Sequence, residues 1–135
     1  KKMINNEIIK LASNTSNVGL KNKYSHKITL KNSFCGDKIT LEIVANKKKI
    51  TSMKYETESC IYCEASASLL SRKIKNINIE DIKNDFSALK RIVKEKKIRI
   101  PKKYSAFNKL LSSDNLNRFQ CIFLPFDAVL KALNL

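Results

Sequence analysis

The chain has 135 residues, of which 43% are hydrophobic and 29% are charged. This is the composition of a globular domain with a core of its own, not that of a disordered or fibrous chain. No stretch approaches the 18 consecutive apolar residues of a membrane span, and two glycines are too few for a glycine-rich phosphate-binding loop. The first thirty residues lack the apolar core of an export signal, so we expect a cytoplasmic location and no membrane partner.

The net charge of +15 comes from 23 lysines and only 4 arginines against 12 acidic residues, alongside 14 asparagines and 16 isoleucines. Surfaces that bind nucleic acid depend on arginine, because its planar guanidinium matches phosphates and base edges. An excess of Lys, Asn and Ile is typical instead of a genome-wide compositional bias. We therefore expect no nucleic-acid partner, and we expect acidic proteins to be attracted to this surface.

The hydrophobic pattern predicts a helix over 3–12, then strands near 26–30, 39–43 and 50–55, the last two joined by a hairpin loop at 46–49. Helical spacing follows over 61–74 and 79–96, with a short helix around 106–111. A final helix is expected to begin near Pro125, since proline suits a first helical turn. This order predicts an α+β fold, a small three-stranded antiparallel sheet with helices packed on one face, in a single domain over 1–135.

Three of the four cysteines fall where the predicted chain reverses direction. Cys35 lies in the turn between the first two strands, Cys60 lies where the third strand meets the long helix, and Cys121 lies on the segment that leads into the last helix. Each could be a small buried apolar residue. In a reducing compartment, however, clustered cysteines more often hold a metal or react. The three reversals could meet at one end of the sheet, and the pattern leaves a metal site and a nucleophile site equally open.

Two local features favour such a site. Gly36 permits a sharp turn, so that the side chains of Cys35 and Asp37 can face one point. Cys60 precedes a helix, and we expect the helix dipole to lower the pKa of its thiol.

The combination of three motifs is specific. Asn-x-x-Cys-Gly-Asp ends at Asp37, Cys-x4-Ala-Ser-x-Ser begins at Cys60, and Cys121 precedes a terminal helix. In this order the chain resembles the U-type iron–sulfur scaffold family, which comprises IscU, SufU and the N-terminal domain of NifU. The segment 119–128 is similar to that of alphaproteobacterial, and hence bacterial, scaffold-like proteins.

The resemblance implies a scaffold that receives iron and persulfide sulfur, builds a [2Fe–2S] cluster and transfers it to apo-proteins, with a cysteine desulfurase as sulfur donor. By the family pattern the ligands are Cys35, Asp37, Cys60 and Cys121. A carboxylate in place of the fourth thiolate leaves one weaker bond, which suits a cluster that is later transferred to another protein. Because the charge around such a cluster is a net −2, we expect a site near the surface, with Lys38 as a candidate to offset the charge. We expect a monomer or a weak dimer.

The long stretch between Cys60 and Cys121 is similar to that of SufU, whose members can hold zinc and relay sulfur. It thus points to an alternative, a zinc-bound sulfurtransferase that relays persulfide sulfur from a cysteine desulfurase. Gln120 stands where IscU proteins carry a histidine, and the Leu-Pro-Pro-Val-Lys segment that IscU presents to its chaperone is absent. In this alternative Zn²⁺ is held by the same four residues. Cys35 and Cys121 are the candidate persulfide acceptors in either case. A binding module without metal would require the motif to be vestigial.

The remaining residues have simpler interpretations. Cys63, one helical turn after Cys60, is an auxiliary thiol or a small packed residue. His26 is expected on a strand face outside the site. Ser66 and Ser68 are expected to allow close helix packing, because no His–Asp partners exist for nucleophilic chemistry.

Overall fold

A computed structural model describes residues 6–33, 36–95 and 100–135. The chain begins with a short helix, followed by three strands and then by three longer helices. In chain order the elements are α1 (Asn6–Ser13), β1 (His26–Lys31), β2 (Lys38–Ala45), β3 (Ile50–Glu58), α2 (Ile61–Lys73), α3 (Ile79–Lys94) and α4 (Phe119–Ala132), with 3₁₀ turns at Ile74–Asn76, Lys102–Phe107 and Ser113–Arg118.

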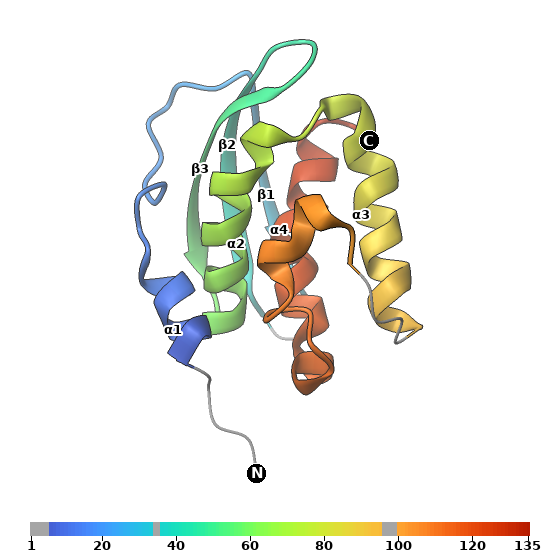
Figure 1. Ribbon diagram of the computed structural model, residues 1–135. Helices are drawn as coiled ribbons and strands as arrows, with labels where there is room; N and C mark the ends of the chain where they lie inside the picture. The colour runs from blue at the N-terminus through green and yellow to red at the C-terminus, as the bar shows by residue number, and fades with distance from the viewer. Residues whose placement is uncertain (1–5, 34–35, 96–99) are drawn as a thin grey trace.

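The three strands form an antiparallel sheet in the order β1-β2-β3. The side chains of Ile39, Leu41 and Ile43 in the central strand are fully buried and point to one face. Helices α2 and α4 cover that face, and α3 lies outside α4 (Figure 1). The predicted α+β fold, with helices on one face of a small antiparallel sheet, is therefore confirmed.

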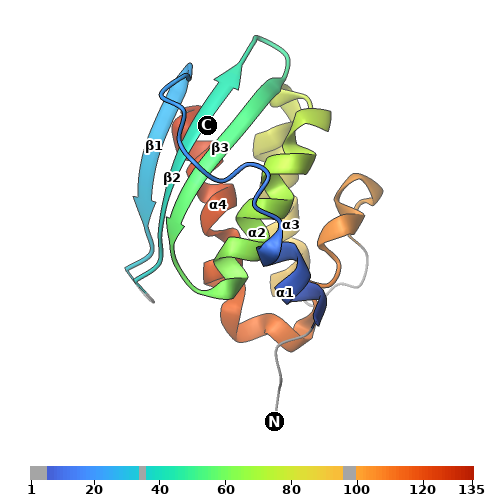
Figure 2. The ribbon, with the colours of Figure 1, turned by 90° about the vertical axis from the view of Figure 1, so that its left-hand side faces the viewer.

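The opposite face of the sheet is crossed by the segment between α1 and β1 (Figure 2). Its anchor is Glu42, whose side chain accepts hydrogen bonds from the backbone N–H groups of Lys21 at 2.7 Å and Asn22 at 3.0 Å. Lys27 adds an ion pair to the same carboxylate at 3.4 Å. Because these partners satisfy the charge, Glu42 can be 1% exposed within a strand.

Two predicted boundaries are wrong. The last helix begins at Phe119, not near Pro125, which is the seventh residue of α4 and is buried inside it. Proline at this position removes the N–H that would bond to the carbonyl of Cys121, a cost that the apolar packing around α4 offsets. The short helix expected around 106–111 is replaced by the 3₁₀ turns Lys102–Phe107 and Ser113–Arg118.

The predicted start of the first helix, at 3–5, and the predicted end of the helix over 79–96, at residue 96, lie outside the described residues. No helix in the described ranges has the length and apolar character needed to cross a membrane.

Candidate metal centre

Strand β2 begins at the lower end of the sheet in Figure 1, and Asp37 directly precedes its first residue. The N–H of Asn32 donates to the carbonyl of Asp37 at 2.7 Å, and the N–H of Gly36 donates to the carbonyl of Asn32 at 2.8 Å. Gly36 adopts a φ of +78°, a conformation that side-chain-bearing residues rarely take. The turn therefore depends on glycine, as the sequence predicted. Cys35 lies outside the described residues, so its place relative to Asp37 stays a prediction.

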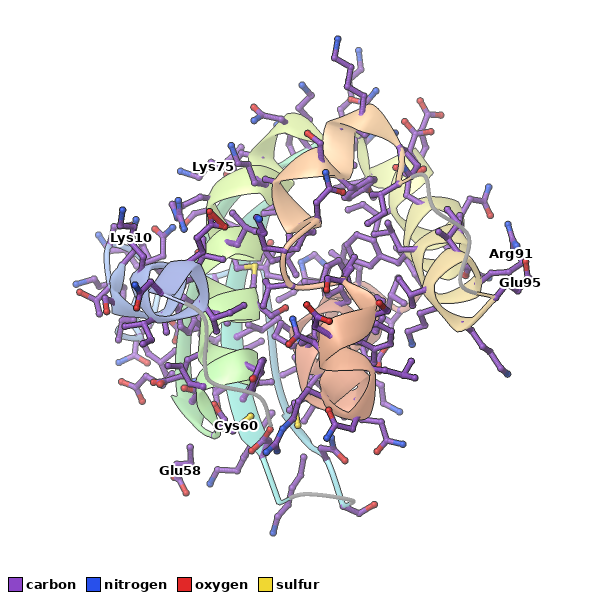
Figure 3. The ribbon with its side chains drawn as sticks, turned by 60° about the horizontal axis from the view of Figure 1, so that its bottom comes forward. Lys10, Glu58, Cys60, Lys75, Arg91 and Glu95 are labelled. Atoms are coloured by element: carbon purple, nitrogen blue, oxygen red, sulfur yellow. The ribbon has the colours of Figure 1, made fainter. Side chains whose placement is uncertain are left out.

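Cys60 lies at the same end of the molecule, as the residue that precedes α2. Its backbone is extended, with φ −73° and ψ 166°, so Cys60 lies outside the first turn of α2 and its side chain does not follow the helical spacing. The carboxylate of Asp37 accepts a hydrogen bond from the backbone N–H of Cys60 at 3.1 Å, and its second oxygen lies 3.4 Å from the Cys60 thiol. Figure 3 looks at this end of the molecule and shows Cys60 at the start of α2, with Glu58 pointing away.

Cys121 completes the group as the third residue of α4. The ligand atoms of Asp37, Cys60 and Cys121 all lie within 4.8 Å of one another. These residues are 23 and 61 positions apart along the chain, and the fold alone brings them together. Sulfur and carboxylate donors at this spacing suit a zinc ion, and thiolates are also the usual ligands of iron–sulfur clusters.

The site is more enclosed than expected. Asp37 is 5% exposed and Cys121 is 3% exposed, while Cys60 is half-buried. The expectation of a near-surface site is wrong for these two residues, because α4 begins before Cys121 and packs its first turn against α2.

The expected lowering of the Cys60 pKa is also wrong. Burial raises the pKa of the Cys60 thiol, and the neighbouring carboxylate of Asp37 raises it further. Hydrogen bonds from the backbone N–H groups of Cys63 and Tyr62, together with the Cys121 thiol, act in the opposite direction but are outweighed. A bound cation would reverse this balance, since metal coordination deprotonates a thiol.

The charge around the site is arranged differently from the expectation. The ammonium group of Lys38, the candidate to offset the site's charge, lies 3.3 Å from Glu58 and is thus already paired with a carboxylate. Arg118, which the sequence reading missed, stacks 5.4 Å from the ring centre of Tyr62. It thereby joins a residue just after Cys60 to one just before Cys121. The only signal for it in the sequence is its position three residues before Cys121.

The other candidate residues are not members of this three-residue group. Cys63 is fully buried in the core. His26 starts β1 opposite Ile43, at the far end of the sheet from Asp37, and its Nδ1 lies 2.9 Å from the hydroxyl of Ser25. Ser66 is buried and donates to the carbonyl of Ile122 at 2.6 Å, so it joins α2 to α4 by a hydrogen bond as well as by its small size.

Comparison with known proteins gives a consistent result. Residues 3–119 match the family model described as the NifU-like N terminal domain. The fold is shared with a nitrogen-fixing NifU-like protein (N-terminal) from Brucella abortus, with a TM-score of 0.85 and 21% identity over 96% of this chain and 91% of that one. It is shared equally with a candidate iron–sulfur cluster assembly scaffold protein for the SUF system from Fervidobacterium islandicum, with a TM-score of 0.85 and 19% identity over 96% of both chains. No curated protein sequence matches the chain.

Proposed function

The chain belongs to the family of NifU-like N-terminal domains, and from this premise we propose that it is an iron–sulfur cluster assembly scaffold. It receives iron and persulfide sulfur, builds a [2Fe–2S] cluster and passes the cluster to apo-proteins. The observation that carries the proposal is the convergence of Asp37, Cys60 and Cys121 within 4.8 Å. Cys35, two residues before Asp37, is the proposed fourth ligand. The proposed sulfur donor is a cysteine desulfurase, and the proposed location is the cytoplasm.

The chemistry of the donors supports a cluster that is held and then released. Thiolates bind iron firmly, whereas the harder carboxylate of Asp37 makes a weaker bond and provides a place for an incoming thiol. Asp37 is linked to Cys60 by two contacts, so the carboxylate is already positioned beside a proposed thiol ligand.

A second function is favoured by one observation. Ligands of a single tetrahedral ion lie closer together than the outer ligands of a cluster that contains two irons. Three ligand atoms that all lie within 4.8 Å of one another are compatible with a single zinc ion. The alternative is a zinc-bound sulfurtransferase that accepts sulfur from a cysteine desulfurase, as the resemblance to SufU implies.

Sulfur acceptance is the same reaction in both cases. The thiolate of Cys35 or Cys121 attacks the terminal sulfur of the desulfurase persulfide. A new S–S bond forms on this protein, the old S–S bond breaks, and the desulfurase cysteine leaves as a thiolate. Cys121 is 3% exposed, so its reaction requires that it become more accessible, whereas Cys35 lies in the sequence between β1 and β2.

Metal analysis and reconstitution separate the two functions. If the protein is a scaffold, anaerobic protein given iron, cysteine and desulfurase should develop the visible absorption of a [2Fe–2S] cluster. It should then transfer the cluster to an apo-ferredoxin. The sulfurtransferase predicts one tightly bound zinc per chain and faster desulfurase turnover, with no transferable cluster. Protein that retains neither metal nor cluster would refute both.

Variants identify the acceptor in the same assay. Intact-protein mass after incubation with desulfurase and cysteine should show an added sulfur that is lost in Cys35→Ser or in Cys121→Ser. Cys63→Ser is the matched control, because Cys63 is buried in the core. An added sulfur that survives both single substitutions and their combination would exclude these two residues as acceptors.

A further inference from the structure

A groove runs beside the candidate metal centre, between the end of β1 and helix α3, with α4 as its base. Its volume is about 920 Å³. Leu30, Val93, Leu116, Phe119, Phe123 and Leu124 give it an apolar lining. Figure 1 shows α4 between the sheet and α3. A groove of this size with apolar walls is suited to side chains of a bound segment.

The rim of the groove is basic. Lys31, Lys90 and Lys94 line it, against the single acidic residue Asp127. Lys90 is paired with Asp127, and its ammonium lies 5.8 Å from the ring centre of Phe123. Among the described residues, Lys31 and Lys94 have no ion-pair partner, and both are exposed. The groove therefore presents two uncompensated positive charges around an apolar floor.

The groove is lined by residues that are close in the chain to the candidate centre. Gln120 lines it and is adjacent in the chain to Cys121, and Asn32 and Ser33 line it at the start of the turn that ends at Asp37. A segment bound in the groove would thus lie next to the residues proposed to exchange sulfur, iron or a cluster.

We propose that this groove is the docking site for an acidic protein segment that carries apolar side chains, supplied by a protein that exchanges cargo with the site. The inference rests on the proposed function for the identity of that cargo, but the groove's chemistry stands on its own residues. Carboxylates of the segment pair with Lys31 and Lys94, while its apolar side chains enter between Leu116 and Phe123. A second copy of this chain is a poor occupant, because two chains of charge +15 repel each other.

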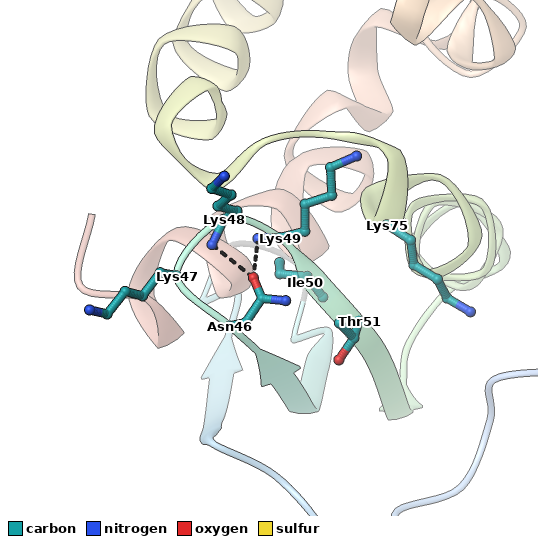
Figure 4. A pocket seen from close by; sticks show the side chains of 7 residues that line it. All are labelled: Asn46, Lys47, Lys48, Lys49, Ile50, Thr51 and Lys75. Atoms are coloured by element: carbon teal, nitrogen blue, oxygen red, sulfur yellow. Dashed lines mark hydrogen bonds between the residues drawn. The ribbon is translucent and has the colours of Figure 1, made fainter.

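The lysines at the other end of the sheet form a natural control. Lys47, Lys48, Lys49 and Lys75 surround an open hollow of about 670 Å³ at the β2–β3 hairpin. Figure 4 shows these four side chains pointing in different directions, while Asn46 accepts hydrogen bonds from the backbone N–H groups of Lys48 and Lys49 at 2.8 Å. The hairpin offers similar charge, but Ile50 is the one large apolar residue in the lining of its hollow.

The probe is a short synthetic peptide in which glutamates alternate with leucines, titrated into the isotope-labelled full chain and followed by NMR. We expect saturable shifts at Lys94, Leu116, Asn117 and Gln120, and binding that weakens as salt rises. The double variant K31E/K94E and the single variant Leu116→Asp should each weaken binding by about tenfold. The double variant K47E/K48E, with the same charge change, should leave the affinity within about twofold.

Leu116 is 48% exposed, so its substitution does not disturb the core, and Leu135→Asp at a 43% exposed position is its matched control. A peptide with lysines in place of glutamates should not bind. Absence of saturable binding, shifts concentrated at the hairpin, or equal losses in the groove and hairpin variants would overturn the proposal. Metal retention by the groove variants reports separately on the proposed function. Peptide binding by a protein that retains no metal would refute the proposed scaffold function alone. Metal retention without peptide binding would refute the proposed docking groove alone.

Discussion

The carboxylate of Asp37 accepts a hydrogen bond from the backbone N–H of Cys60 at 3.1 Å, across 23 residues of sequence. This bond joins the residue before β2 to the residue before α2. It also satisfies a backbone N–H at the start of that helix, a position where polar side chains are commonly needed. Asp37 therefore has a structural role in addition to its proposed role as a ligand.

The two roles of Asp37 can be separated by substitution. Asp37→Ala should slow cluster release to a chelator by several-fold. The substitution removes the carboxylate, the weakest of the proposed ligands, and leaves a cluster that is bound mainly by sulfur or is closed by an incoming thiol. Asp37→Asn keeps an oxygen that can accept from Cys60 but lacks the anionic ligand, so it should slow release to a similar extent while retaining more stability. Release is measured by the decay of visible absorption. Glu58→Ala is the control, because its side chain is 79% exposed. Unchanged or faster cluster release in both Asp37 variants would contradict the proposed role of Asp37 as the weakest ligand.

Cys60 and Cys63 should differ in metal retention. We expect Cys60→Ser to abolish it, since the Cys60 thiol lies within 4.8 Å of the other ligand atoms. Cys63→Ser should retain metal but lower the free energy of unfolding by about 1–3 kcal/mol, because it introduces a hydroxyl at a fully buried position. Metal content after gel filtration and denaturant unfolding measure the two effects. Equal loss of metal in both variants would make Cys63 a ligand.

Ser66 connects the helices that carry Cys60 and Cys121. Ser66→Ala removes its hydrogen bond to the carbonyl of Ile122 and should cost about 1 kcal/mol in the free energy of unfolding. Ser66→Leu should cost more, about 1–3 kcal/mol, because it forces additional volume into a fully buried helix contact. We expect metal affinity to fall in the leucine variant and to hold in the alanine variant. Urea unfolding and metal competition check this, and an unaffected leucine variant would show that the contact is not tight.

Stability should depend on pH through Glu42. Burial acts to raise the pKa of this carboxyl, but hydrogen bonds from the N–H groups of Lys21 and Asn22 and the nearby Lys27 ammonium outweigh it, so the pKa is lowered. A lowered folded-state pKa stabilises the fold above the unfolded-state pKa, about 4.3 for glutamate, and the contribution is lost as the pH falls through the folded-state value.

Glu42→Gln should therefore lower the melting temperature at neutral pH, and the difference from the natural chain should shrink on acidification. The exposed Glu56, on the adjacent strand, provides the control Glu56→Gln. A difference between Glu42→Gln and the natural chain that is constant from neutral to strongly acidic pH would contradict the role given to the Glu42 charge.

The sequence by itself determined the element types, because periods of two and of about 3.6 residues report directly which side chains face a core. Ile39, Leu41 and Ile43 indicated a strand with one buried face, and Ile82, Phe86, Leu89 and Val93 indicated a helix with one buried stripe; the structure confirms both. The motifs of Asp37, Cys60 and Cys121 lie at predicted chain reversals, which made a shared site possible, and the family resemblance implied that these residues are ligands of one site. The structure places their ligand atoms within 4.8 Å of one another.

Only the tertiary structure decided how Cys60 and Cys63 differ. Three positions apart, they would share a face of a continuous helix. Cys60, however, has an extended backbone and points toward Asp37, while Cys63 belongs to the helix and points into the core. The start of α4 was likewise decided by packing, since buried apolar contacts allow Pro125 inside the helix against its local preference. The pKa of Cys60 and the basic rim beside α4 depend on which groups lie nearby in space, and a linear pattern of residues does not contain those distances.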